Sequence, residues 1–234
     1  MSVTIIDRLL SFRKQWAGRR FDRRHGVETV AMLDRHELTG MPVEIRQHAG
    51  AYVPTNPSLF RRMIRKAGVD PRQFTFIDLG CGKGRIVIAA ADYPFKAIIG
   101  IESDAAVYET AKRNLDHWQE THSDPRLKLI HGDARNFEAP PGNLFIYMYS
   151  PFRGPIFEQV AERLADLAGE PGRAVVIAYS ADWEADILER TGRFVRIPMR
   201  RRQFWAPSTV SFFYNAPADR MRRSNHQGVF RPST

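Results

Sequence analysis

Residues 74–93 read FTFIDLGCGKGRIVIAAADY, and this stretch decides the fold. Its first five residues form an apolar run that predicts a short buried strand, and the apolar residues after Gly84 predict a helix. Three glycines between them, Gly80, Gly82 and Gly84, allow a tight turn and let a ligand approach the backbone. A helix that begins directly after such a turn also offers amide donors and positive dipole character. The stretch therefore predicts a strand, a ligand-binding loop and a helix in succession.

The spacing of these glycines distinguishes two kinds of ligand site. A dinucleotide-binding loop reads G-x-G-x-x-G, which would place its third glycine at position 85. That position holds Arg85, and the glycine comes one residue earlier, at Gly84. The pattern is G-x-G-x-G, preceded by Asp78 two residues before the first glycine. This spacing argues against an NAD-dependent oxidoreductase.

The rest of the chain alternates strands with helices. Helical patterns fill residues 57–67, 104–119, the segment after Pro155 and residues 181–191. Further apolar runs predict strands at 96–102, 127–133, 143–149, 173–179, 193–199 and 208–215. Continuous apolar strands are typical of a parallel sheet covered on both faces. We predict an α/β fold, Rossmann-like and doubly wound, with a mostly parallel seven-stranded sheet and a C-terminal antiparallel hairpin.

Carboxylates close three successive predicted strands. Asp78 ends the first, Glu102 the second and Asp133 the third. In open α/β sheets ligands bind at the carboxyl ends of the strands, so these acids should border one crevice. A carboxylate can accept hydrogen bonds from ribose hydroxyls or from an adenine amino group.

With these residues in place, the segment from about Tyr52 to Phe152 resembles the class I S-adenosylmethionine-dependent methyltransferases. FDRRHGVET at 21–29, the Tyr52-x-Pro54-Thr55 element and DLGCGKGR at 78–85 are similar to a bacterial group of unassigned substrate. The resemblance implies S-adenosyl-L-methionine as cofactor and S-adenosyl-L-homocysteine as product. It implies the following cofactor-binding positions: Asp78 beside the methionine end, Gly80, Cys81, Gly82 and Gly84 in the floor, Glu102 and Ser103 at the ribose, Asp133 and Ala134 at the adenine, and Tyr52 and Thr55 over the methionine end.

The class places acceptor-facing residues after the fourth strand, where this chain reads Ser150-Pro151-Phe152. The segment resembles the N/D-P-P-Y/F motif of enzymes that methylate planar amino groups, and we take these three residues as catalytic candidates. It departs from that motif in two ways, because a serine replaces Asn or Asp and only one proline is present. The hydroxyl of Ser150 can still accept a hydrogen bond. A strand-ending turn without a catalytic role stays open as the alternative.

The chain of 234 residues predicts three parts. Residues 1–57 form a helical or irregular extension, residues 58–216 the cofactor-binding domain, and residues 217–234 a basic, disordered tail. The first 20 residues have helical apolar spacing. Net charge is +9, with basic residues gathered near both ends, which favours an acidic partner: nucleic acid, an anionic membrane or an acidic protein surface. The oligomeric state is not determined by these patterns.

Composition also bounds the compartment and the chemistry. Cys81 is the only cysteine, and no signal peptide or apolar stretch of membrane-spanning length is evident, so we predict a cytoplasmic protein. Zinc-protease and paired-cysteine motifs are absent, so no metal site is predicted. The favoured function is methyl transfer to a nitrogen of a protein or small amine. RNA or DNA methylation is the alternative, followed by an oxidoreductase and by a non-catalytic S-adenosylmethionine-binding protein.

Overall fold

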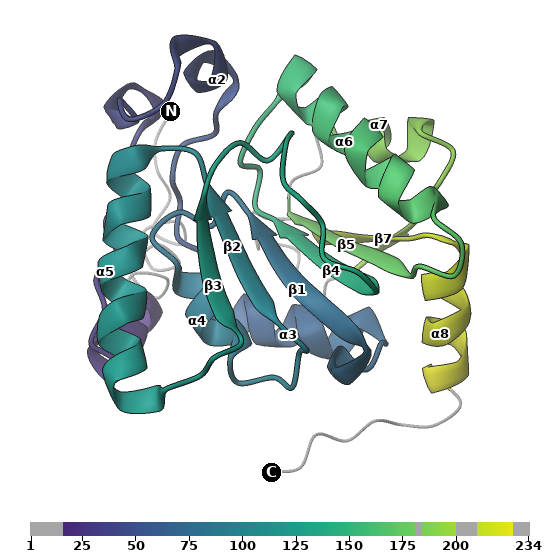
Figure 1. Ribbon diagram of the computed structural model, residues 1–234, viewed down its shortest axis with the longest axis horizontal. Coiled ribbons are helices and arrows are strands. Elements are labelled where there is room, and N and C mark those ends of the chain that lie inside the picture. Colours follow the sequence, from purple (N-terminus) through teal and green to yellow (C-terminus); the bar gives the residue numbers. More distant parts are fainter. Residues whose placement is uncertain (1–15, 181–183, 200–209, 227–234) are drawn as a thin grey trace, which may run out of the picture.

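The computed structural model describes residues 16–180, 184–199 and 210–226. Its centre is one seven-stranded sheet in the order β3-β2-β1-β4-β5-β7-β6 (Figure 1). Pairing among the first five strands is parallel, whereas β7 pairs antiparallel with both β5 and β6. The predicted parallel sheet with a C-terminal antiparallel hairpin is confirmed. The strands are β1 (Phe74–Leu79), β2 (Ile98–Glu102), β3 (Leu127–His131), β4 (Asn143–Met148), β5 (Val175–Ser180), β6 (Val195–Pro198) and β7 (Val210–Tyr214).

Helices cover both faces of the sheet (Figure 1). Residues 16–25 are helical, and the labelled helices are α2 (Val43–His48), α3 (Pro57–Ala67), α4 (Arg85–Ala90), α5 (Ala105–His122), α6 (Gly154–Gly169), α7 (Ala185–Arg190) and α8 (Ala216–His226), with short 3-10 turns η1 (Arg35–Glu37) and η2 (Pro71–Gln73). One hydrophobic core lies between the sheet and helices α3, α4 and the C-terminal half of α5. A second core lies between the other face of the sheet and helices α6 and α7. Among the described helices, none combines the length and apolarity needed to cross a membrane.

Side chains of β1 point alternately to the two faces of the sheet and so contribute to both hydrophobic cores. Phe74 and Phe76 pack in the first core, and Ile77 and Leu79 pack in the second. All six residues of the strand are buried, as expected for a central parallel strand. Because β1 and its neighbours β2 and β4 run parallel, their carboxyl ends meet at the same edge of the sheet.

The extension before α3 belongs to the same folded body. Asp104 caps α5 as predicted, accepting from the amides of Ala106 and Val107 at 3.0 Å each. Its other oxygen accepts from the Gly40 amide at 2.7 Å, which ties the extension to the first turn of α5. The predicted boundary at residue 57 falls on the first residue of α3.

The prediction of a disordered tail from residue 217 is wrong for its first part, because α8 runs from Ala216 to His226. Asn215 starts this helix: its side-chain oxygen accepts from the Ala218 amide at 3.2 Å and from the Val175 amide at 2.9 Å. Ala218 is fully buried, and Asp219 pairs with Arg222 one turn later. The many basic residues suggested a disordered tail, but Asp219 of the same helix pairs with Arg222 and Arg223. Residues 227–234 and 1–15 lie outside the described part of the chain.

Candidate functional site

A cavity opens at the carboxyl edge of the sheet. It collects most of the residues that the sequence singled out, from segments far apart in the chain. On its walls lie Tyr52, Thr55, Asp78, Gly80, Cys81, Gly82, Glu102, Ser103, Asp133, Ala134, Pro151 and Phe152. Gly84 and Ser150 are not among the lining residues.

The glycine loop between β1 and α4 folds over the end of β2. The amides of Gly80 and Cys81 both donate to the carbonyl of Ile101, at 2.9 and 3.0 Å. Gly80 and Gly82 have φ of 76° and 56°, a region that favours glycine. A Cβ at Gly80 would collide with Pro151, and one at Gly82 with the ring of Tyr52. The loop therefore forms the floor of the cavity and packs closely against Pro151 and Tyr52.

Gly84 lies outside the cavity lining, whereas Cys81 is part of it. Gly84 caps α4 with φ of 83°, and a Cβ there would be in ordinary contact with Ala111 of α5. It therefore serves the turn into the helix. Cys81 is buried, and this burial, with Asp78 and Glu102 nearby, raises the pKa of its thiol well above the usual range. Its place beside a helix N-terminus does not activate it.

Glu102 at the end of β2 organises the cavity wall. Its Oε2 accepts from the Gly82 amide at 2.9 Å, and its Oε1 accepts from the amides of Ser103 and Asp104 at 2.9 Å each. Burial nevertheless raises the pKa of this carboxyl. Asp78 is also buried, and desolvation together with the nearby Glu102 raises its pKa well above the ordinary value. The cavity thus holds two desolvated carboxyls that a cationic or hydrogen-bond-donating ligand would stabilise in their charged forms.

Asp133 lies on the cavity wall beyond β3, but a neighbour already engages it. Its Oδ1 accepts from the Arg135 amide and its Oδ2 from the Arg135 guanidinium, both at 2.8 Å. These bonds fix the carboxylate in the turn after β3, beside the adjacent Ala134. Each oxygen retains a second lone pair for an incoming donor.

In addition to Tyr52 and Thr55, the N-terminal extension gives the cavity an apolar side that the sequence did not reveal. Apolar side chains from η1 to the end of α2 line it, namely Leu38, Met41, Ile45 and Ala49. Three of these residues, Leu38, Met41 and Ala49, form a small core with Val107 of α5. Turn-forming residues dominate this part of the sequence, so no helical or strand periodicity predicts that these four residues line a cavity.

Buried Arg85 attaches this extension to the glycine loop. Its Nε donates to Thr29 Oγ1 at 2.6 Å, and its Nη1 donates to the Thr55 carbonyl at 3.3 Å. Asp22 accepts from Arg85 Nη2 at 3.4 Å and from the amides of Thr29 and Val30 at 2.7 and 3.0 Å. Asp22 and Thr29 belong to the FDRRHGVET segment at 21–29, so the structure supplies the physical reason for that pattern.

Tyr52 and Thr55 both line the cavity, and the Tyr52 ring lies against Gly82 of the glycine loop. The Tyr52 hydroxyl donates to the Thr29 carbonyl at 2.9 Å, and the Lys83 ammonium lies 5.6 Å from the centre of its ring. The Thr55 hydroxyl bonds the Tyr147 hydroxyl of β4 at 2.6 Å. These hydrogen bonds hold Tyr52 against the backbone at Thr29 and hold Thr55 against strand β4.

The segment after β4 meets the extension. The Pro151 carbonyl accepts from the Gly50 amide at 2.8 Å, and Phe152 forms an antiparallel bridge with Ala49. Ser150 adopts φ of 50°, and its hydroxyl is buried without a hydrogen-bond partner among the described residues. Pro151 and Phe152 face the cavity, whereas Ser150 serves as a left-handed turn residue beside it.

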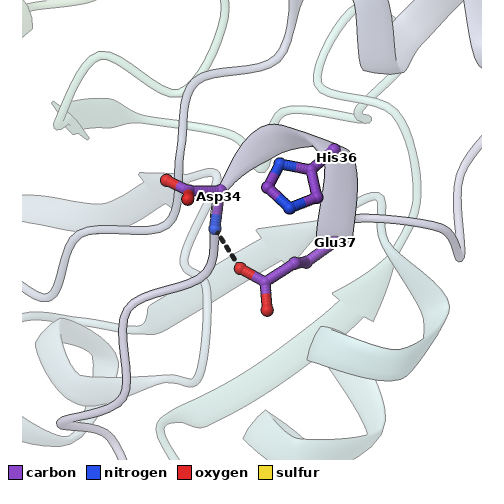
Figure 2. A group of neighbouring side chains, drawn as sticks. All are labelled: Asp34, His36 and Glu37. Carbon is purple, nitrogen blue, oxygen red and sulfur yellow. Dashed lines mark hydrogen bonds between the residues drawn. The ribbon is translucent and has the colours of Figure 1, made fainter.

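Among the described residues, one group of side chains could hold a metal ion, and none of its members lines the cavity. Figure 2 shows Asp34, His36 and Glu37 around the short turn η1, all three exposed. The Glu37 carboxylate accepts from the Asp34 amide at 2.7 Å, so this pair forms a capping box for the turn. That role accounts for the grouping.

Comparisons with known proteins agree with this geometry. Residues 76–169 match a family described as a methyltransferase domain. A protein-lysine N-methyltransferase of Saccharolobus islandicus (strain REY15A) is 39% identical over 66 residues, which are 28% of this chain and 40% of that protein. The chain thus aligns with less than half of that relative's length.

Solved structures share the fold. A putative RNA methyltransferase from Pyrococcus horikoshii superposes with a TM-score of 0.52 at 15% identity, over 87% of this chain and 96% of that one. An RNA methyltransferase from Salinibacter ruber in complex with S-adenosyl-L-homocysteine gives a TM-score of 0.49 at 24% identity, over 70% and 94% of the two chains. Residues 76–169 are thus similar to a methyltransferase domain, and the sheet that contains them is Rossmann-like.

Proposed function

We propose that this protein transfers a methyl group from S-adenosylmethionine to a nitrogen atom of a protein or small-molecule acceptor, by direct in-line displacement. One observation supports this above all: acids that end β1 and β2, and the acid just beyond β3, border a single cavity over a glycine floor. Asp78, Glu102 and Asp133 all line that cavity.

The residues present fit the cofactor. Asp78 would face the methionine end, Glu102 the ribose hydroxyls and Asp133 the adenine amino group, with the Ala134 amide beside the ring. Gly80 and Gly82 let the loop lie directly against Pro151 and the Tyr52 ring, where any Cβ would collide. The unequal environments of the acids suit these tasks, because desolvated carboxyls favour hydrogen-bond donors and positive charge.

The bound cofactor supplies a methyl group that its sulfonium already makes electrophilic. The protein must then hold the acceptor nitrogen about 3 Å from that methyl, in line with the breaking bond, and keep water away. Phe152 and Pro151 border the cavity on the acceptor side, and the apolar wall from Leu38 to Ala49 limits access of water. The Pro151 carbonyl is taken by Gly50, so the planar-amine pattern of two acceptor oxygens is not reproduced. A flexible primary amine, as in the matched protein-lysine methyltransferase, therefore suits the site better than a planar one.

Nucleic-acid methylation is the second candidate, because the net charge is +9. The cytoplasm is proposed as the location on the sequence evidence of a lone cysteine.

Calorimetric titration with S-adenosylhomocysteine tests the site. Asp78→Ala and Glu102→Ala should each lower affinity by about 1–3 kcal/mol, because each removes a buried acceptor. Glu109→Ala, on the exposed face of α5, is the matched control. Unchanged affinity in both site variants would refute the assignment.

Tritiated S-adenosylmethionine with fractionated lysate identifies the acceptor. Label that is lost after protease and kept after nuclease supports a protein acceptor. Label that is lost only after nuclease would exclude it.

A further inference from the structure

The helix of residues 16–25 and helix α3 carry an unusual excess of positive charge. The first contains four arginines, and α3 contains Arg61, Arg62, Arg65 and Lys66. The acid within the first helix, Asp22, points inward to buried Arg85. Helix α3 contains no acid. Together the two helices form a surface with little internal compensation.

Helices α5 and α7 contain enough acids to balance their basic residues, whereas α8 contains one acid for three arginines. Lys112 pairs with Asp116 on α5 at 2.8 Å, Arg190 with Asp186 on α7 at 3.4 Å, and Arg222 with Asp219 on α8 at 2.7 Å. Within the described ranges, the side chains of Arg20, Arg24 and Arg61 have no carboxylate within 4.0 Å. The excess of basic residues is therefore largest on these two helices and smaller on α8.

These arginines line a cleft between the two helices. Arg20, Arg24 and Arg61 are exposed along it, Phe21, Pro57 and Ala89 contribute apolar atoms, and Asp92 is the acid on its wall. Trp16 also lines it and is 53% exposed, with the Arg20 guanidinium 5.7 Å from its ring. Cationic groups beside apolar and aromatic atoms are the combination that binds a phosphate and an unstacked base together.

We propose that this cleft binds single-stranded nucleic acid, with phosphates on Arg20, Arg24 and Arg61 and a base against Trp16. A duplex keeps its bases stacked inside and would leave the apolar atoms of the cleft without a partner. An anionic membrane fits less well, since a concave cleft with one exposed aromatic residue offers little apolar surface for insertion. The cleft is separate from the cofactor cavity and backs onto it through Arg85, whose guanidinium lies 5.8 Å from the Phe21 ring.

Fluorescence anisotropy of the full-length protein with a labelled 20-nucleotide oligouridylate tests this proposal, in NaCl from 50 to 300 mM. The triple variant R20Q/R24Q/R61Q should bind at least tenfold more weakly at 150 mM. Its log–log salt slope should fall by about 2, because each lost phosphate contact removes about 0.7. Trp16→Ala should weaken binding about fivefold or more, through the lost stacking alone.

The matched control K112Q/R113Q/R190Q removes the same charge from α5 and α7. It should bind within about twofold of the wild type. Equal losses in the two triple variants would overturn the proposal, and so would no binding by the wild type at 50 mM NaCl. Cleft-dependent binding to phosphatidylserine vesicles without oligonucleotide binding would identify a membrane surface instead.

Affinity for S-adenosylhomocysteine separates this proposal from the proposed function. The cleft triple variant should keep wild-type cofactor affinity and melting temperature, because its three side chains are exposed. A protein that binds oligouridylate and fails to bind the cofactor would disprove the methyltransferase assignment and leave the cleft proposal standing.

Discussion

Replacing Asp22 with asparagine should weaken both the fold and cofactor binding. The Asp22 carboxylate accepts from two amides, from the Thr29 hydroxyl and from the Arg85 guanidinium. The Arg85 side chain is only 4% exposed, so the variant leaves a cation buried without its counter-ion. Burial already lowers the pKa of Arg85, which shows that its surroundings disfavour the charge.

The magnitude follows from these contacts. Removing one partner of a buried ion pair costs about 3–5 kcal/mol. This pair is long, at 3.4 Å, and Arg85 keeps its bonds to Thr29 and Thr55, so the low end applies. We expect a loss of about 2–3 kcal/mol in the free energy of unfolding, since an amide oxygen still satisfies part of the network. For a chain of this size the melting temperature should fall by about 4–12 °C.

Urea unfolding followed by circular dichroism measures the stability, and calorimetry measures affinity for S-adenosylhomocysteine. Affinity should fall at least fivefold, because Thr29 holds the Tyr52 hydroxyl and Arg85 holds the backbone of Thr55, both on the cavity wall. Asp116→Asn breaks an exposed pair on α5 and should leave both quantities unchanged. Wild-type stability and affinity in Asp22→Asn would show that the network does not hold the wall.

The remaining predictions concern the acids, the loop and α8. Burial and the nearby Glu102 raise the pKa of Asp78, so the native state binds more protons than the unfolded chain above about pH 4, and this group's contribution to stability falls as pH rises. Asp78→Asn removes that loss; without cofactor its stability relative to the wild type should increase between pH 4 and 7, and a flat difference in urea titrations would contradict this. Gly82→Ala should abolish measurable S-adenosylhomocysteine binding in calorimetry, because φ is 56° and the new methyl meets the Tyr52 ring; wild-type affinity would rule out the loop as floor. Asn215→Ala should cost about 2–3 kcal/mol in chemical unfolding, because buried backbone groups, including the Val175 amide, lose their partner, and a cost below about 0.5 kcal/mol would disprove this role.

Much of the fold was predictable because its signals are local. The strand, glycine loop and helix of residues 74–90 follow from apolar runs and glycine spacing, and the structure confirms them as β1 and α4. The N-cap at Asp104 was equally readable, since capping depends on one side chain and the next few amides. The tail was misjudged because α8 is held by Asn215 and by burial of Ala218.

The candidate site divides in the same way. Sequence spacing alone placed Asp78, Glu102 and Asp133 at strand ends, and parallel pairing then brings such ends to one edge of the sheet. The sequence left a strand-ending turn at Ser150 open as an alternative, but its left-handed backbone could not be read there, because that geometry depends on contact with the extension around Gly50.

By itself, the sequence determined the sheet, the glycine floor and the acids of the cavity, because each is encoded within a short window of residues. Only the tertiary structure decided which segments wall the cavity and which residues line the separate cleft. Arg85 finds Asp22 across 63 residues, and the wall from Leu38 to Ala49 has no period of its own. Contacts between distant segments depend on how whole elements pack, and no local pattern of residue types records that packing.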